Sequence, residues 1–250
     1  MPCYPAFGVL LGLGLAAGPR RWVHGGYAAL AVVGLLAGTV AAVILYQVRG
    51  VPAPGDISSA LTQNPEAYTL SLGHLRDLTL AAFAYLRAPL LAAGLALVAG
   101  AVGAWVTRRG QLGPLFLAGM MVVLLQAAHF AMKVFDPYLS SRPLAEALLA
   151  APAGQLIIEG HYYPASSLVF YTNRAALLYH GKADNLVYGA AAPGVPPVFL
   201  EDADLARLWK EPRRLYLIAP EESRRRLEGL LGAVTVFAAR GGKLLLTNRP

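Results

Sequence analysis

The stretch YAALAVVGLLAGTVAAVILYQV, from Tyr27 to Val48, decides the class of the fold. Its 22 residues include no charged side chain, and about 20 consecutive apolar residues are enough for a helix to cross the hydrocarbon core of a bilayer. The stretches 88–106 and 112–132 have the same character. The sequence therefore predicts an integral membrane protein.

A further apolar stretch, residues 3–18, is shorter and contains both glycine and proline. A secretory signal peptide would need a basic segment before its apolar core, and no Lys or Arg precedes this stretch. We therefore interpret it as a marginal span, and the predicted number of spans is about four.

Charged residues divide the chain into two halves. Residues 1–135 hold eight Lys/Arg and three Asp/Glu, whereas residues 136–250 hold thirteen and eleven. We predict a membrane helical region over 1–135 and a soluble domain over 136–250, which is long enough for its own core. Most of the net charge of +7 comes from the membrane half, so it does not indicate a nucleic-acid partner. The single cysteine, Cys3, excludes an intrachain disulfide.

Arginine pairs predict the orientation of the chain. The two short connections, 19–26 and 107–111, each carry an Arg pair, and such loops usually stay in the cytoplasm. The longer 49–87 loop and everything after about residue 134 are then expected on the outer face. In a bacterium this describes an inner-membrane protein with a periplasmic domain.

The outer loop ends in a segment with helical periodicity. Apolar side chains recur at helical spacing from Leu72 to Leu86, while His74 and Asp77 lie on another face. This pattern predicts an amphipathic helix near 70–86 that lies in the membrane interface. Its polar residues are either its solvated face or groups that contact a charged lipid head, and the sequence leaves both interpretations open.

The last span carries polar residues on one side. Gln126, His129 and Lys133 are spaced i, i+3 and i+7, so they share a helix face. Polar groups within membrane helices usually face protein or a wet cavity. We predict that they line a cavity open to the outer side, although His129 and Lys133 also fit a simple marking of the membrane interface.

The second half alternates strand-like and helix-like segments, which indicates an α/β domain. Residues 165–174 are ambiguous, and glycines 241–242 predict a hairpin turn. Strands are predicted at 155–163, 176–181, 185–190, at the start of 198–211, at 213–220 and in the hairpin 234–250. Helices are predicted to follow Pro143, Asp202 and Glu221.

The sequence has none of the common catalytic signatures. It lacks a phosphate loop, a CxxC pair, HExxH and GxSxG. Glu159 and His161 stand near Ser166, but no third group is available to orient them, which disfavours a hydrolase. No His/Asp/Glu spacing indicates a metal site, and no span carries the buried carboxylate expected of a transporter.

Five extended stretches resemble one known family. They are LSLGHLRDLTLAAFAYLR (70–87), FDPYLSSRPLAEAL (135–148), GHYYPASSLVFYTNRAALLYHGKADNLVYGA (160–190), VFLEDADLARLW (198–209) and GGKLLLTNRP (241–250). The chain is similar to the C-terminal half of bacterial lipid-carrier-dependent glycosyltransferases of the protein O-mannosyltransferase and aminoarabinose-transferase-like superfamily (families 39 and 83).

The resemblance implies the GT-C membrane fold and an inverting transfer of a sugar from a polyprenyl-phosphate carrier to an acceptor on the outer face. The donor substrate is the polyprenyl-phosphate sugar; no further cofactor is assigned, a divalent metal is not indicated, and metal dependence stays open. Because the departing phosphate concentrates negative charge, fixed cations would stabilise it. The expected carrier-phosphate ligands are His74, Arg76, Arg87 and Lys133, and the expected supporting residues are Asp77, Gln126 and His129.

The family places its catalytic acid in an N-terminal outer loop, whereas the first carboxylate of this sequence is Asp56. We therefore expect the chain to represent the C-terminal portion of such an enzyme, with the catalytic residues unknown. Three origins stay open: a split gene with a separate N-terminal half as a partner, a truncated gene model, or a degenerate remnant. The alternative is a non-enzymatic, membrane-anchored sensor or scaffold. The sugar and the acceptor are not assigned by the sequence.

Overall fold

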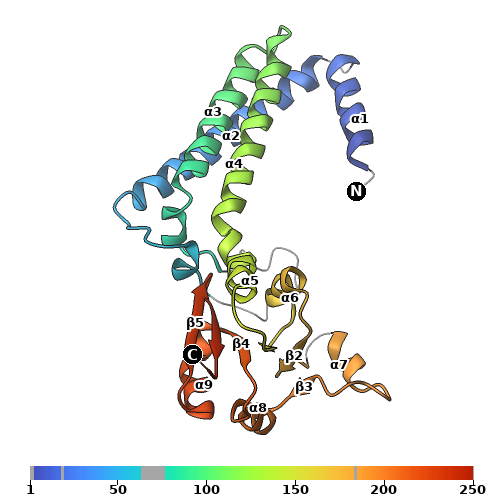
Figure 1. The fold of residues 1–250 in the computed structure, drawn as a ribbon. Coiled ribbons are helices and arrows are strands. Elements are labelled where there is room, and N and C mark those ends of the chain that lie inside the picture. Colours follow the sequence, from blue (N-terminus) through green and yellow to red (C-terminus); the bar gives the residue numbers. More distant parts are fainter. Residues whose placement is uncertain (1–2, 18–19, 63–76, 183–184, 250) are drawn as a thin grey trace. The chain divides into compact units, whose positions relative to one another are not determined.

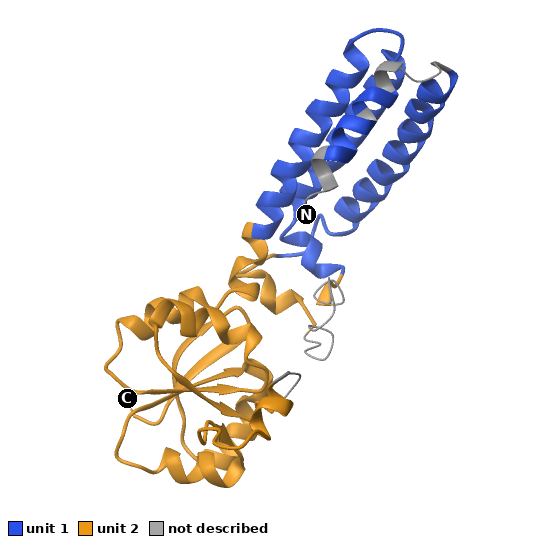
Figure 2. Cartoon of the chain, turned by 90° about the vertical axis from the view of Figure 1, so that its right-hand side faces the viewer, with its two compact units in different colours: residues 1–52, 80–132 blue, residues 53–79, 133–250 orange. Residues whose placement is uncertain are grey.

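The computed structural model describes residues 3–17, 20–62, 77–182 and 185–249. The chain forms two compact units (Figure 2). Unit 1 consists of Met1–Pro52 and Leu80–Met132, and unit 2 of Ala53–Thr79 and Lys133–Pro250. Residues 53–79, which lie between two apolar helices in the sequence, thus belong with the C-terminal domain.

Unit 1 is built from long apolar helices (Figure 1). Within the described residues, three of them are long and apolar enough to cross a membrane. The first helix has only 15 residues, so the predicted count of about four spans is not confirmed. The helices are α1 (Cys3–Ala17), α2 (Arg20–Gln47), α3 (Arg87–Val106) and α4 (Leu112–Leu139), of which α2, α3 and α4 are the candidate spans.

Glycines bring α2 and α3 close together. A Cβ atom added at Gly34 would lie 2.6 Å from Ala101 Cβ and 2.7 Å from the Leu97 carbonyl oxygen. Small residues allow helix backbones to approach in a membrane, where packing replaces the hydrophobic effect as the driving force. Small residues within the apolar sequences of α2 and α3 therefore form the surface on which the two helices pack.

The described part of the 49–87 loop is short and irregular. A 3₁₀ helix, η1 (Ile57–Ala60), follows Asp56, whose Oδ1 accepts a 2.9 Å hydrogen bond from the Ser58 N–H. Leu61 and Leu78 form an antiparallel bridge, and a second 3₁₀ helix, η4 (Ala81–Ala84), follows.

The predicted interfacial helix near 70–86 is therefore not continuous. Residues 70–76 lie outside the described residues, and residues 77–86 form the bridge and η4 rather than one α-helix. The physical reason is that Asp77 is fully buried and Leu78 pairs with Leu61. These tertiary contacts override the local helical periodicity.

Unit 2 contains one mixed sheet with the order β3-β2-β1-β4-β6-β5. The β1–β2, β1–β4 and β2–β3 pairs are parallel, and β6 runs antiparallel to both β4 and β5. The strands are β1 (Gln155–Glu159), β2 (Ala176–Tyr179), β3 (Phe199–Leu200), β4 (Leu215–Pro220), β5 (Thr235–Arg240) and β6 (Lys243–Thr247).

Helices cover both faces of this sheet (Figure 2). They are α5 (Arg142–Leu149), α6 (Ser166–Thr172), α7 (Asn185–Ala190), α8 (Asp202–Trp209) and α9 (Arg224–Leu231), with 3₁₀ helices η5 (Tyr163–Ala165) and η6 (Glu221–Ser223). Ile157 contributes to the core under α8 and α9, whereas Leu156 and Ile158 contribute to the core under α5 and α6. Burial on both faces explains the continuous apolar run of β1.

The α/β prediction for this domain is confirmed, with two differences in the elements. The strand predicted at 155–163 ends at Glu159, and η5 begins at Tyr163. Residues 185–190, predicted as a strand, form α7, and the ambiguous segment 165–174 contains α6. The hairpin turn is confirmed: Gly241 and Gly242 have φ angles of 60° and 71°. Positive φ at both central residues is the geometry that a two-residue hairpin turn requires.

Candidate functional site

Two of the predicted carrier ligands, His74 and Arg76, lie outside the described residues. Arg87, the third, is the first residue of α3 and is half-buried. Its guanidinium Nη2 donates hydrogen bonds to the carbonyl oxygens of Val48 and Val51, at the end of α2. Its Nε is buried and has no hydrogen-bond partner in the described part of the chain. Arg87 therefore caps α2 and retains one buried donor.

The polar residues of α4 are on its surface. Gln126, His129 and Lys133 are all exposed, while the neighbouring Ala127 is buried. Exposure leaves these side chains available to a ligand, a neighbouring helix or lipid head groups. The cavity predicted beside them stays a prediction.

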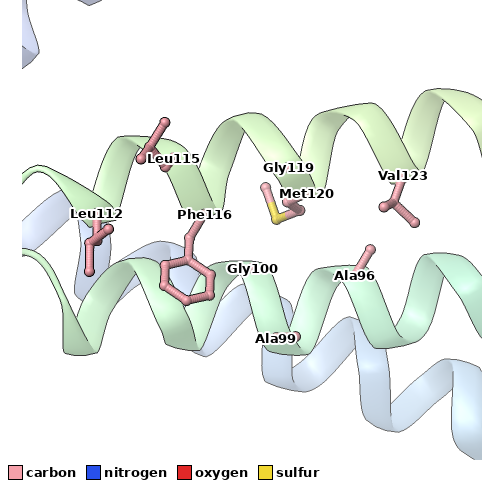
Figure 3. Close-up of a pocket in the computed structure, with 9 residues that line it drawn as sticks. All are labelled: Ala96, Ala99, Gly100, Leu112, Leu115, Phe116, Gly119, Met120 and Val123. Carbon is pink, nitrogen blue, oxygen red and sulfur yellow. The ribbon is translucent and has the colours of Figure 1, made fainter.

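A cavity of about 340 Å³ lies between α3 and α4 (Figure 3). Every residue that lines it is apolar. On α4, Met120 lies close to Gly100 of α3 and Phe116 lies close to Gly103. A cavity without polar groups suits a hydrocarbon chain and has nothing to bind a sugar or a phosphate.

Asp77 is not on a solvated helix face, which was one of the two interpretations of the sequence pattern. It is fully buried, and its Oδ2 accepts a 2.7 Å hydrogen bond from the Tyr138 hydroxyl in the last turn of α4. Its carbonyl oxygen also accepts from the Thr62 N–H at 3.0 Å. The buried hydrogen bonds satisfy a group that would otherwise be costly to bury.

Asp56 joins the same region to the hairpin turn. Its Oδ2 accepts a hydrogen bond from the Gly241 N–H at 3.3 Å. Burial alone would raise the pKa of Asp56, but the hydrogen bonds from Ser58 and Gly241 and the charge of Arg240 outweigh burial and lower it. The carboxylate is therefore ionised at neutral pH and fixes the turn between β5 and β6.

Lys243, which the sequence analysis did not select, lies beside these groups. It is the first residue of β6, and its Nζ donates a 2.9 Å hydrogen bond to the Tyr138 carbonyl oxygen. Burial lowers the pKa of Lys243 to about 8. One sequence signal was available: Lys243 is a lone cation between a Gly-Gly turn and the apolar run LLL.

We call Asp56, Asp77, Tyr138, Gly241 and Lys243 the junction cluster. It joins the 53–79 loop, the end of α4 and the β5–β6 turn, all within unit 2. The hairpin turn packs closely on the end of α4, because a Cβ atom at Gly241 would lie 1.7 Å from the Pro137 carbonyl oxygen. The cluster thus holds a largely buried lysine and two hydrogen-bonded carboxylates on three segments that meet at the end of α4.

A second polar cluster lies where the parallel strands β1 and β2 end. Arg226 of α9 donates to Glu159 Oε1 and, at 2.7 Å, to the Tyr179 hydroxyl, which donates to Asp202 at 2.7 Å. His180 Nε2 lies 2.9 Å from Asp202 Oδ1. We call Glu159, Tyr179, His180, Asp202 and Arg226 the carboxyl-edge cluster.

Burial governs the acid–base properties of the carboxyl-edge cluster. It raises the pKa of Tyr179 to about 12, with the hydrogen bond to Asp202 acting in the same direction. It also raises the pKa of Glu159, despite the opposing charge of Arg226. Glu159 accepts from Ser223 at 3.0 Å, whereas Ser166 donates to the Tyr163 carbonyl oxygen. These bonds give no support to a hydrolase built on Glu159.

Metal binding has no visible basis in the part of the chain that the structure describes. No group of three or more His, Cys, Asp or Glu residues there could hold an ion. Mixed charge, rather than convergent metal ligands, characterises both polar clusters.

The fold of apolar helices and a mixed α/β unit was compared with known proteins. No protein-family profile matches the sequence, and no curated protein matches it. Two crystal structures share the fold: ArnT from Cupriavidus metallidurans bound to undecaprenyl phosphate, and the same protein in the apo state. Each has a TM-score of 0.67 and 18% sequence identity, and the match covers 98% of this chain.

The match covers 40% of the ArnT chain, so this chain spans less than half of the length of that protein. At the level of the fold, the similarity confirms the resemblance to the aminoarabinose-transferase-like superfamily that the sequence motifs indicated.

Proposed function

We propose that this chain is the carrier-binding portion of an integral-membrane glycosyltransferase that uses a polyprenyl-phosphate sugar. The observation that supports the proposal most strongly is the fold shared with ArnT over 98% of the chain, since one of the two ArnT structures contains undecaprenyl phosphate. The membrane would be the bacterial inner membrane, with about four spans and unit 2 on the periplasmic side.

The reaction class defines what the chain must supply. In an inverting transfer, the bond between the sugar C1 and the carrier phosphate breaks as the acceptor oxygen attacks C1 from the opposite face. The acceptor proton passes to a base, and the phosphate leaves with the bonding electron pair. Fixed cations favour this departure because they stabilise the charge that develops on the phosphate.

We assign phosphate binding to His74, Arg76, Arg87 and Lys133. Arg87 is the described residue with the clearest capacity, because its buried Nε has no partner among the described residues. Lys133 is exposed on α4. Gln126 and His129 would line the approach on the same helix, and Asp77 would support the 53–79 loop through its bond to Tyr138.

The apolar cavity between α3 and α4 suits the prenyl chain. Its volume of about 340 Å³ and its wholly apolar lining fit several isoprene units rather than a head group. We propose that the base that takes the acceptor proton lies in the part of the ArnT fold that the match does not cover. This part would be on the same chain or on a partner. The sugar and the acceptor stay open.

Carrier binding by the purified chain tests the proposal. The chain in phosphatidylcholine nanodiscs would be titrated with undecaprenyl phosphate and with undecaprenol, which lacks the phosphate. We expect the phosphate to be required, and Arg87→Gln to weaken binding about tenfold, as expected for a charged hydrogen bond. Arg87→Lys should retain part of the affinity, and Arg109→Gln, at an exposed position in the opposite connection, should change nothing.

The competing function is a non-enzymatic sensor or scaffold anchored in the membrane. It requires no carrier site, so it predicts that undecaprenyl phosphate binds no better than undecaprenol. That result with a folded parent chain would overturn the transferase proposal and favour the scaffold.

A further inference from the structure

Three large aromatic side chains are exposed on η5 and α6 of unit 2. Tyr163 is 59% exposed, Phe170 is 79% exposed and Tyr171 is 44% exposed. The rings of Phe170 and Tyr171 lie 5.3 Å apart. Scattered apolar side chains on a surface are ordinary, whereas apolar side chains that gather in one place mark a surface that contacts a partner or a membrane.

Helical spacing places this aromatic surface away from the core of the domain. Ala165, Leu168 and Thr172 are buried and are spaced three and four residues apart, so they form the side of α6 that packs on the sheet. Tyr163 and Phe170 are seven residues apart, about two helical turns, and their exposure places them on the outer side. We call Tyr163, Phe170 and Tyr171 the aromatic face.

Hydrogen bonds fasten η5 and α6 to the residue that follows the end of α4. The Ser141 N–H donates to Ser167 Oγ at 2.7 Å, and Ser141 Oγ donates to the Pro164 carbonyl oxygen at 2.9 Å. Ser141 comes two residues after Leu139, the last residue of α4. The aromatic face therefore lies on elements that are bonded directly to the end of a candidate membrane span.

The length of α4 places its end at the level of the lipid head groups. Its 28 residues correspond to a helix of about 42 Å. A bilayer with both of its head-group layers is about 40–45 Å thick. A surface fastened to the end of such a helix meets lipid head groups before it meets any other partner.

The chemistry of the aromatic face suits this level of the bilayer. Tyrosine has an apolar ring and a polar hydroxyl, and such rings are enriched where hydrocarbon meets water. Arg142 lies over the Tyr171 ring at 5.7 Å and pairs with Glu146 at 2.9 Å. Arginine can pack its apolar stem on such a surface while its charged end stays among polar groups.

We propose that the aromatic face is a membrane-docking surface, which inserts into the head-group layer of the bilayer on the side where α4 ends. Its occupant is phospholipid, and the contact fixes how unit 2 lies on the membrane. The inference requires that α4 spans the bilayer, and it does not depend on sugar transfer or on binding of the carrier.

Fluorescence quenching of the full chain in phosphatidylcholine nanodiscs tests the docking surface. Cys3, the sole cysteine, would be replaced by serine, and an environment-sensitive dye would be attached at Phe170→Cys. Arg225→Cys is the control, because Arg225 is exposed on α9, which packs on the opposite face of the sheet from α6. We expect phosphatidylcholine with a nitroxide on its head group to quench most of the fluorescence at 170 and little at 225. Iodide, a quencher in the water, should show the reverse preference.

A second labelling position shows whether the apolar character of the face matters. With the dye at Tyr163→Cys, Phe170→Glu should abolish most of the quenching by nitroxide lipid, because a carboxylate resists transfer out of water. Phe170→Leu should retain the quenching. The thermal unfolding midpoint identifies any variant that fails to fold, and Tyr163→Cys replaces Phe170→Cys if the latter does not fold.

Each outcome has one meaning. Quenching at 170 by iodide to the same extent as at 225, without quenching by nitroxide lipid, would place the aromatic face in water and overturn the inference. Protection of the dye at 170 from both quenchers would show that protein covers the face, which would also overturn it. Failure of the chain to bind undecaprenyl phosphate would count against the proposed function and leave this inference in place.

Discussion

The hydroxyl of Tyr138, in the last turn of α4, donates a 2.7 Å hydrogen bond to Oδ2 of Asp77, which lies 61 residues earlier in the chain. Both side chains are buried. The bond holds the 53–79 loop to the end of α4, and the Tyr138 carbonyl oxygen holds Lys243. One residue of α4 therefore connects a loop, a helix and a strand.

Removal of the Tyr138 hydroxyl should destabilise unit 2. Tyr138→Phe takes one donor from a buried carboxylate, which should lower the free energy of unfolding by about 1 to 3 kcal/mol. Tyr188→Phe is the matched control, because Tyr188 is 84% exposed. Chemical unfolding in detergent measures both, and equal stability of the two variants would contradict the role of Tyr138.

The hairpin turn should not tolerate a side chain at Gly241. Gly241→Ala places a Cβ 1.7 Å from the Pro137 carbonyl oxygen, at a φ of 60°. Gly194→Ala is the control for the strain of a positive φ, since its φ is 80° and nothing lies within 4 Å of the added Cβ. We expect about 1 to 2 kcal/mol of destabilisation for Gly194→Ala and clearly more for Gly241→Ala, from chemical unfolding.

The buried ammonium of Lys243 should reduce stability at neutral pH. Its pKa falls from 10.5 to about 8 on folding, so below pH 8 the folded chain keeps a proton at a cost on the order of 3 kcal/mol. Lys243→Met avoids this cost but loses the hydrogen bond to Tyr138. We expect it to raise the free energy of unfolding at pH 7 by about 1 to 3 kcal/mol.

The sign of the pH dependence distinguishes this effect from better packing. Between pH 8 and 10.5 the unfolded chain binds more protons at this position than the folded chain does. The stability of the parent should therefore rise with pH in this window, relative to Lys243→Met. A difference between the two proteins that is constant from pH 7 to 10 would show that the buried charge is not its cause.

Arg226 should matter most when Glu159 is ionised. Burial raises the pKa of Glu159 above 4.5, so stability from this group is present at low pH and is lost as the pH rises through the folded pKa. Arg226→Met should cost about 1 to 2 kcal/mol at pH 7, less than breaking a fully buried pair because Arg226 is partly exposed.

The cost of Arg226→Met should shrink as the pH falls toward 4, because the raised pKa of Glu159 favours its protonated form in the folded chain. It should also shrink in the Glu159→Gln background, which gives a double-mutant cycle for the pair. Denaturant unfolding of the four proteins at both pH values measures it, and additive effects would rule out coupling between Arg226 and Glu159.

Packing of α2 on α3 should depend on Gly34. An added Cβ there would lie 2.7 Å from the Leu97 carbonyl oxygen, a backbone atom with no room to move. Gly34→Ala should therefore lower the thermal midpoint of the membrane unit. Gly119→Ala, on α4, has nothing within 4 Å of the new Cβ and should leave the midpoint unchanged or raised, since alanine favours the helix.

Local sequence signals predicted the three long helices, the α/β class of unit 2 and the hairpin turn. The spans are visible because a bilayer requires long apolar runs, and the turn because Gly241 and Gly242 adopt positive φ angles. The same signals failed at residues 185–190, where apolar residues suggested a strand but α7 forms. Tyr188 in α7 is 84% exposed. The apolar residues of this segment are therefore not all buried, as they would be in a strand within the sheet.

The polar contacts of the junction cluster were beyond local analysis. Asp77 was predicted on the polar face of an interfacial helix because its neighbours follow a helical period, yet its partner Tyr138 is 61 residues away. Lys243 and Tyr138 are separated by 105 residues. Contacts at such separations depend on the tertiary fold, and a single sequence contains no periodicity that reports them.

Unit 2 is discontinuous in the sequence, and this has a consequence for how the chain is threaded through the bilayer. The bond between Tyr138 and Asp77 requires residues 53–79 and 133–250 to emerge on the same side. The number of crossings between them must then be even, and α3 and α4 supply two. An insertion error that leaves one of these helices outside the bilayer would separate the two pieces of unit 2 by a whole membrane.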